Sequence, residues 1–438
     1  MIKLFERHTR IAVGRVKRKK SPFIYKAYSK KPKHKWLRKR NAQERRFKRT
    51  GLFCILIAFF FLISLIWNIF SNGYSAFTEA QINLPVEFNA ELIEQDSYRK
   101  IVQNALLELF PTVEDRKEKR ELFSLVSRSA PHILKNIVEE NPEAIGKKAM
   151  VWIPASSAVS LFYKQHLYEQ AKRSGKISEA QTAWVTGLTR AQKMRLKFNA
   201  AFFKNGDSRE AEQAGVLAST IGSFMTILVC IAMALPLGVA TAIYLEEFAR
   251  KSWFTDFIEI NINNLAAVPS IIFGLLGLSI YLNLFGLPRS SSLVGGMVLA
   301  LLVLPVIVIA TRNALQAVPP SIRYAAAALG ATPTQVVFHH TLIYALPGIM
   351  TGVILSIARA FGESAPLLMI GMVAFIADVP KTLTDPATTL PVQVYLWANN
   401  PELGFVEKTA AAIMVLLTFM VLINLLAIYI RRRFEIKW

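Results

Sequence analysis

The chain of 438 residues lacks the motifs by which many proteins hold nucleotides or metals. No Gly-x-x-x-x-Gly-Lys-Ser/Thr phosphate loop occurs, because the Gly-Lys pairs at 146–147 and 175–176 stand without the other residues of that motif. The six histidines include the neighbours His339 and His340, but no His-Glu-x-x-His spacing. We therefore predict no catalytic residues, no metal site and no cofactor bound by this chain, so any chemical energy must come from another chain.

Cysteine and charged residues are also scarce. The two cysteines, Cys54 and Cys230, both fall inside apolar runs, where a free thiol packs as a small hydrophobic group. Only 19% of the residues are charged, whereas 53% are hydrophobic. The length would allow two or three soluble domains, but this composition and its clustering favour a membrane protein.

The hydrophobic residues gather in runs that are long enough to cross a bilayer. A hydrocarbon core about 30 Å thick requires roughly 20 apolar residues in a helix. Residues 52–71 form the first such run and carry no charge. Five more runs follow at residues 216–243, 265–285, 293–311, 345–369 and 409–430. We therefore predict an all-α membrane protein with six transmembrane helices.

Positive charge is concentrated at the beginning of the chain. Residues 1–50 contain twenty Lys or Arg against two Glu, a net charge of +18, so the other residues carry only +4 of the total +22. Basic clusters at 17–20 and 45–49 precede the first run, and another at 431–437 follows the last. The positive-inside rule then predicts cytoplasmic N- and C-termini, which requires an even number of spans and agrees with six.

A basic tail of this kind can also attract nucleic acid. Because this one directly precedes a membrane span, the plainer interpretation is that it sets the topology and attracts anionic lipid head groups. We therefore predict membrane lipids, and no nucleic acid, among its partners.

The order of these segments predicts five regions. A basic cytoplasmic tail (1–51) and a first transmembrane helix (52–71) precede an insertion of about 140 residues (72–215), which this topology places on the outer, periplasmic side. The five-helix core and the basic cytoplasmic C-terminus follow at 216–430 and 431–438. Within the insertion, we expect helices at 99–110 and 180–203 and a strand-like patch at 150–162, and in the outer loop 371–408 a short helix near 392–398.

The cytoplasmic loop 312–344 has clear local signals. Residues 321–329 include four consecutive alanines and predict a helix, which Gly330 is suited to end in a left-handed conformation. Thr332 would cap a second helix that begins at Pro333. Two short helices exposed between two spans would form a small knob that fits a groove on another protein. The alternative is an ordinary connection between helices.

The fifth run combines small residues with two charges. Gly348, Gly352, Ser356, Ala360 and Ser364 recur every four residues, a pattern that permits close packing of helices in a membrane.

Arg359 and Glu363 lie four residues apart in the same run, which predicts that they share one helical face. Charged side chains within a bilayer are costly and usually face a bundle interior or an aqueous path. A guanidinium group suits oxyanions, and a carboxylate can balance it. The alternatives are a buried pair that fixes helix register, or charges near the outer interface.

The loop resembles the cytoplasmic loop by which permeases of ABC importers dock onto their ATPase, with its Glu-Ala-Ala, three residues and Gly. Tyr324 stands in the position of the Glu, and Ile343 replaces a usual Pro after the retained Leu342. The resemblance implies that ATPase coupling involves Arg323, Tyr324, Ala325, Ala326, Gly330, Ala331 and Thr332.

The run IARAFGESAPLL (357–368) resembles the fifth-span signature of permeases of phosphate importers, with Ser364 in place of the usual Thr. The stretches at 236–249 and 263–278 resemble the same family, and the basic segment 41–52 resembles its extended form. The resemblance implies a type I ABC importer permease of the bacterial inner membrane. It places Arg359, Glu363 and Ser364 on the substrate pathway.

The same resemblance implies the partners. They would be a homologous permease subunit in a heterodimer, a dimeric ATP-binding subunit that uses ATP and Mg²⁺, and a periplasmic phosphate-binding protein. Two alternatives within the class are import of another oxyanion and the role of the partner phosphate permease. An alternative of another class is a membrane-anchored sensor or interaction protein.

Overall fold

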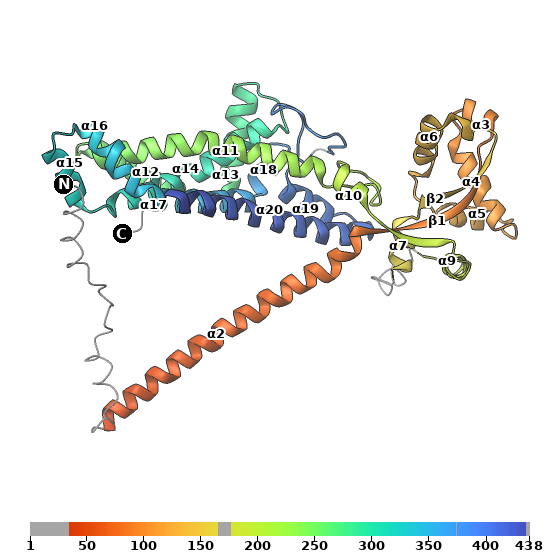
Figure 1. Cartoon of the computed structure of the whole chain (residues 1–438), viewed down its shortest axis with the longest axis horizontal. Coiled ribbons are helices and arrows are strands. Elements are labelled where there is room, and N and C mark those ends of the chain that lie inside the picture. The colour runs from red at the N-terminus through yellow and green to blue at the C-terminus, as the bar shows by residue number, and fades with distance from the viewer. Residues whose placement is uncertain (1–34, 165–176, 374, 435–438) are drawn as a thin grey trace, which may run out of the picture. The chain divides into compact units, whose positions relative to one another are not determined.

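The computed structural model describes residues 35–164, 177–373 and 375–434, and the predicted basic cluster at 17–20 lies outside these ranges. The chain forms two compact units, residues 1–67 and 68–438, which are described separately. In the first unit, α2 (Lys35–Gly73) is a continuous helix of 39 residues, whose last turns belong to the second unit. It includes the predicted first span and extends beyond it at both ends (Figure 1).

The second unit begins with a small α+β region, residues 74–204, here named the insertion domain. Three antiparallel strands pair in the order β2-β1-β3, with Ile82 opposite both Ile153 and Met194. The strands are β1 (Thr78–Glu87), β2 (Lys148–Pro154) and β3 (Met194–Phe198). The helices are α3 (Ala90–Glu94), α4 (Tyr98–Leu109), α5 (Arg116–Phe123), α6 (Ala130–Glu140), α7 (Ser157–Tyr163), α9 (Glu179–Arg190) and α10 (Ala200–Lys204), with 3-10 turns at Tyr74–Phe77 and Pro142–Ala144.

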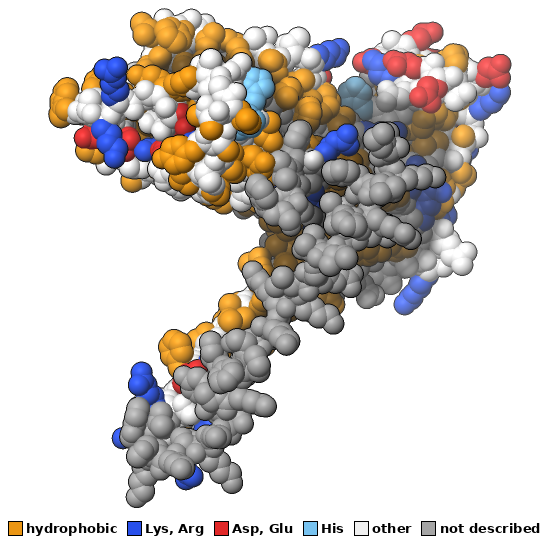
Figure 2. All heavy atoms as spheres, turned by 60° about the vertical axis from the view of Figure 1, so that its left-hand side comes forward, with side chains coloured by type: hydrophobic (Ala, Val, Ile, Leu, Met, Phe, Trp, Pro, Cys, Tyr) orange, Lys and Arg blue, Asp and Glu red, His pale blue; other side chains and the backbone are white. Residues whose placement is uncertain are grey.

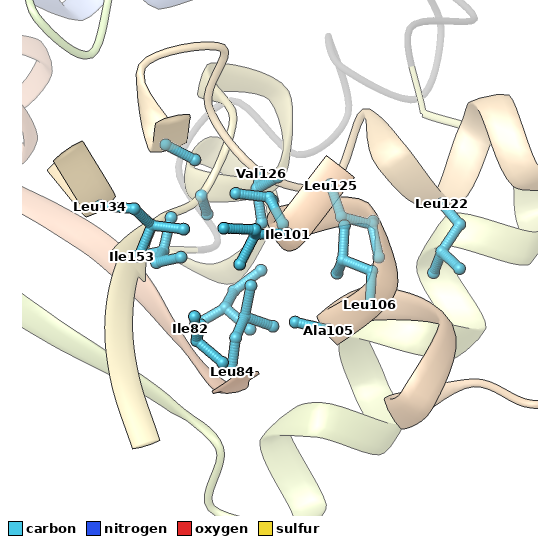
Figure 3. Close-up of a cluster of buried hydrophobic side chains, with 14 of the residues drawn as sticks. Ile82, Leu84, Ile101, Ala105, Leu106, Leu122, Leu125, Val126, Leu134 and Ile153 are labelled. Atoms are coloured by element: carbon cyan, nitrogen blue, oxygen red, sulfur yellow. The ribbon is translucent and has the colours of Figure 1, made fainter. Parts of the chain in front are cut away.

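This domain has a hydrophobic core of its own. Ile82 and Leu84 of β1 pack with Ile101 and Leu106 of α4 and with Leu134 of α6 (Figure 3). All five side chains are almost fully buried, and burial of one such side chain contributes about 1.5–3 kcal/mol. The insertion therefore contains enough apolar packing to fold around its sheet.

Two local predictions for the insertion are confirmed only in part. The expected helix at 180–203 ends at Arg190, and β3 follows after a turn in which Gln192 has a positive φ of 54°. The sequence of β3, Met-Arg-Leu-Lys-Phe, alternates apolar and basic residues as a strand does. The patch at 150–162 is also divided, because β2 ends at Pro154 and α7 begins at Ser157. The mainly helical fold class nevertheless holds for the chain.

Long helices form the rest of the second unit. Four are long and apolar enough to span a membrane and, with α2, make five in the described chain. They are α11 (Leu217–Ile243, continued by a π-helical turn at Tyr244–Phe248), α14 (Ser292–Gln316), α17 (Leu342–Gly362) and α20 (Gly404–Phe434). Hydrophobic side chains cover much of the face seen in Figure 2, and many on these helices, including Leu228 and Leu422, are exposed as lipid contact requires.

The predicted span at 265–285 is not one straight helix. It is replaced by α12 (Trp253–Ala266) and a helix that begins as α13 (Ser270–Gly277) and continues in π form through Leu278–Leu284. The two parts meet at a bend of 103°. Pro269 lies in the break, where it cannot donate a backbone hydrogen bond and disfavours a helical conformation at Val268. The described residues therefore contain five candidate spans, or six if this bent pair counts as one.

Small residues bring the long helices together. A Cβ atom added at Gly348 would lie 2.7 Å from the Cβ of Ala314, and one at Gly352 would overlap Ala310. Ser356 and Ala360 are buried along the same face. The predicted stripe of small residues is therefore a packing surface between α17 and α14.

Candidate functional site

Arg359 lies in the last turn of α17, but Glu363 does not share its helical face. The helix ends at Gly362, and Glu363 has an extended backbone conformation with φ −97° and ψ 107°. Pro366 explains this end, because its ring would clash with the carbonyl group of residue 362 in a continuous helix. After Ser364 the chain forms the short helix α18 (Ala365–Met369). The predicted helix through 369, and the same-face arrangement derived from it, are therefore wrong.

The three predicted pathway residues lie at or directly before this break. The structure leaves Arg359, Glu363 and Ser364 half-buried. Among the residues that the structure describes, no ion pair joins Arg359 to a carboxylate. On the adjacent face of α17, Ser356 and Ala360 line an apolar gap of only about 10 Å³. Arg359 is therefore a partly accessible guanidinium group beside tightly packed helices.

The two short helices predicted for the cytoplasmic loop are present. The first, α15 (Pro320–Ala328), is followed by Gly330 with a φ of +86°. The second, α16 (Pro333–Gln335), begins with a capping box between Thr332 and Gln335 and continues through a π-helical segment, Val336–Thr341, into α17. Local sequence signals were sufficient here because each acts on its own turn of backbone.

The loop exposes an apolar surface. The side chains of Tyr324 and Leu329 are 74% and 90% exposed, whereas Ala326 is buried and holds α15 in place. Ala325 and Thr332 are exposed, and Ala331 is half-buried. Tyr324 lies within α15 and Leu329 directly follows it, and two such large exposed hydrophobic residues suit contact with another protein.

Arg323 does not belong to that exposed surface. Its guanidinium group pairs with Glu247 in the π-helical turn after α11, with 2.8 Å between Nη2 and Oε1. It also donates to the carbonyl groups of Leu315 and Val318 at 2.9 Å each. Arg323 therefore fixes α15 to the ends of α11 and α14.

A second charge cluster, which was not predicted from the sequence, lies beside this pair. Arg312 of α14 pairs with Glu259 of α12 at 2.9 Å and with Glu246 at 3.4 Å. The side chain of Gln316 donates to Glu246 at 2.9 Å. The only available sequence signal was the adjacent pair Glu246 and Glu247 at the end of an apolar run. Their partners come from distant segments and follow only from the fold.

A buried ion pair connects the insertion domain with α20. Lys164 and Glu407 lie 3.0 Å apart, with side chains only 5% and 8% exposed. Ser75 also donates to Glu407, at 2.7 Å. Nearby, the buried Lys408 donates to the carbonyl group of Ala214 at 3.2 Å. We name this region, with Glu212 beside it, the joint.

Glu212 is the least satisfied member of the joint. One carboxylate oxygen accepts a hydrogen bond from the backbone of Ser157, while the other is buried without a hydrogen-bond partner among the described residues. Burial raises the pKa of Glu212 to about 7, and the nearby Glu402 acts in the same direction.

Comparison with known proteins defines the class. Residues 234–436 match the family described as binding-protein-dependent transport system inner membrane component. Residues 34–173 match a domain of unknown function (DUF3333). The long apolar helices within residues 234–436 thus fall in a segment that resembles an inner-membrane component of a transport system.

The family follows from individual relatives. The chain is 35% identical over 214 residues to the phosphate transport system permease protein PstA of Yersinia pestis, covering 49% of this chain and 71% of that protein. It is 34% identical over 214 residues to PstA of Haemophilus influenzae, covering 49% and 74%. The chain belongs to the PstA family of ABC transporter permeases, which confirms the resemblance predicted from the sequence.

A solved structure of the MetNI methionine ABC transporter is also similar to this chain. It shares 20% sequence identity with a TM-score of 0.41, and the match covers 51% of this chain and 95% of that one.

Proposed function

We propose that this chain is the permease subunit of an ATP-driven importer and forms part of the path by which inorganic phosphate crosses the inner membrane. The names of its PstA relatives support phosphate as the substrate. The observation that carries the proposal is the position of Arg359, a half-buried guanidinium group at the end of an apolar helix, without a carboxylate partner among the described residues.

In this mechanism Arg359 meets phosphate in transit. A guanidinium group can donate two parallel hydrogen bonds to an oxyanion, and its charge favours the anion in a medium of low polarity. The hydroxyl group of Ser364 supplies a further donor at the break after α17. Glu363 limits how tightly the anion is held, because a carboxylate close to the path repels it.

The knob formed by α15 and α16 is the proposed contact with a dimeric ATPase, which uses ATP and Mg²⁺. The exposed Tyr324 and Leu329 would enter a groove of the ATPase, while the Arg323–Glu247 pair passes its movement to α11. A homologous permease completes the membrane path, and a periplasmic phosphate-binding protein delivers the substrate.

The proposed topology follows from the basic flanks. Both termini and the loop 312–344 face the cytoplasm, and the insertion 72–215 faces the periplasm. The division into tail (1–51), first span (52–71), insertion, core (216–430) and C-terminus (431–438) is part of this proposal.

The test compares two arginines. We expect Arg359→Gln to reduce phosphate uptake by the assembled transporter at least a hundredfold, because the anion loses its cationic partner in the membrane. Uptake of labelled phosphate into cells and the amount of transporter in the membrane are measured together. The matched control is Arg289→Gln, which removes an exposed arginine from a loop and should leave uptake within twofold of the unchanged chain.

Normal phosphate affinity and uptake in the Arg359→Gln variant would show that the pathway assignment is wrong. Competition by other oxyanions in the same assay then decides the substrate. If unlabelled sulfate displaces labelled phosphate as well as unlabelled phosphate does, the proposed preference for phosphate is incorrect.

A further inference from the structure

A cleft of about 1050 Å³ lies between the insertion domain and loops of the helical core. Four arginines line it: Arg99 of α4, Arg120 of α5, Arg128 before α6, and Arg209 in the loop before α11. We name it the basic cleft. All four arginines are exposed, so their guanidinium groups are accessible to a molecule that enters from solvent.

The negative groups of the cleft are already engaged by the protein itself. Glu210 pairs with Arg128 at 3.4 Å. Glu402 accepts a hydrogen bond from the hydroxyl group of Ser157, and Glu212 accepts one from its backbone. Each of the three carboxylates that line the cleft therefore has at least one partner there, although one buried oxygen of Glu212 has none among the described residues.

Most of the arginines that line the cleft have no carboxylate partner within the protein. Among the described residues, the structure shows no ion pair for Arg99, Arg120 or Arg209. Arg209 lies over the ring of Phe375 at 5.9 Å, which leaves its hydrogen-bond donors available. The unused capacity of the cleft is thus cationic, and an occupant with several carboxylate groups complements it.

The size and openness of the cleft decide what kind of anion fits. Sites for small molecules enclose most of their ligand and have volumes of roughly 300–1,000 Å³. This cleft is as large as the upper end of that range, and Arg128 keeps 87% of its side chain exposed. A single oxyanion would leave most of the space and most of the arginines unused. A peptide segment that remains attached to a larger body would reach several arginines at once.

We propose that the basic cleft is a docking site for an acidic peptide segment of a partner protein on the same side of the membrane. The cleft is lined by both the insertion domain and the loops that lead into α11 and α20, so the docked segment contacts both. This interaction does not rest on the identity of the transported ion, because Arg359 is not part of the cleft.

The experiment uses the full-length protein and a ten-residue peptide of alternating Asp and Glu that carries a photoreactive benzoylphenylalanine at one end. After illumination, mass spectrometry identifies the residues of the protein that are crosslinked. We expect crosslinks on cleft-lining segments such as 99–106 and 120–131, and we expect them to weaken as salt is added. Mapping is essential because the basic residues 1–50 can also attract the peptide.

Two double variants with the same change in charge provide the comparison. Arg99→Gln with Arg120→Gln should lower crosslinking in the cleft about tenfold, since each lost contact with a carboxylate weakens binding. Arg116→Gln with Arg190→Gln removes two exposed arginines of the same domain that do not line the cleft. This double variant should lower crosslinking in the cleft less than twofold.

Three results would overturn the proposal. The first is crosslinking confined to residues 1–50, and the second is an equal loss in both double variants, which would indicate attraction by net charge alone. The third is displacement of the peptide from the cleft by inorganic phosphate but not by sodium chloride of equal ionic strength. That outcome would assign the cleft to a small oxyanion.

Discussion

The insertion domain and the helical core differ in how closely their backbones approach one another. The insertion domain buries large side chains such as Ile82, Leu106 and Leu134 around a sheet. The helical core also buries large side chains such as Leu302 and Leu315, but in addition it brings helix backbones together at small residues such as Gly348 and Gly352. The difference follows from the solvent, because water drives large apolar groups inward whereas lipid offers no such force between helices.

This comparison predicts that added volume is most harmful in the helical core. Gly352→Leu would force α17 away from α14, because a side chain at this position overlaps Ala310. Overpacking usually costs about 1–3 kcal/mol, and we expect more here because backbone, rather than a flexible side chain, must move. The amount of folded protein in the membrane should fall at least tenfold. It is measured as the amount of monodisperse protein that size-exclusion chromatography recovers after extraction.

The control for this change is Thr351→Leu, one residue earlier, where the side chain is exposed. It should leave the yield within twofold of the unchanged chain. A second comparison is Gly187→Leu in α9, where nothing lies within 4 Å of the added Cβ atom. If Gly352→Leu is tolerated as well as these two, close packing between α14 and α17 does not hold the core together.

The insertion domain should respond more strongly to lost volume. Leu106→Ala removes a side chain that is fully buried in the core of the domain, and such changes cost about 2–5 kcal/mol. Limited proteolysis of the purified protein should then cut residues 74–204 faster while the segment 217–434 stays intact. Leu196→Ala, on the exposed face of β3, should leave the cleavage rate nearly unchanged. Equal cleavage of both regions would show that they unfold as one.

The sequence predicted local features better than distant contacts. Gly330 and Thr332 were assigned correctly because each determines only its own turn of the chain. The spacing of Arg359 and Glu363 predicts a shared helical face, but this prediction is wrong because α17 ends at Gly362, as Pro366 indicates. In the same way, Pro269 marked the bend within the predicted second span of the core.

Other features could not be predicted from one sequence. The pairing of Arg323 with Glu247 joins residues 76 positions apart, and that of Lys164 with Glu407 joins residues 243 apart. Nothing in the spacing of these residues indicates the contact, which depends on how helices and the insertion domain come together. Family resemblance predicted the permease, whereas local signals predicted the knob, and the resembling segments did not include the insertion domain.

The joint between the two regions should make stability depend on pH. Glu212 has an ordinary pKa of 4.5 in the unfolded chain, and burial raises it to about 7 in the folded protein. Between these values the folded state keeps a proton that the unfolded state has released. The contribution of Glu212 to the free energy of unfolding should therefore fall as the pH rises from 4.5 to about 7, by at most about 3 kcal/mol, and stay at its lower value above that range.

Glu212→Gln should remove this part of the pH dependence, because an amide stays neutral as the protonated carboxyl group does. The melting temperature of the purified protein at pH 5 and pH 8 measures the effect, and the difference between the two should shrink in the variant. Burial also raises the pKa of Glu79 and of Asp207, so a smaller dependence of stability on pH, with the same sign, should remain.

Gln213→Ala, a change of the neighbouring residue that alters no titratable group, serves as the control. If Glu212→Gln melts with the full pH dependence of the unchanged chain, the joint does not hold a protonated carboxyl group, and the two regions are connected by the Lys164–Glu407 pair without a contribution from Glu212.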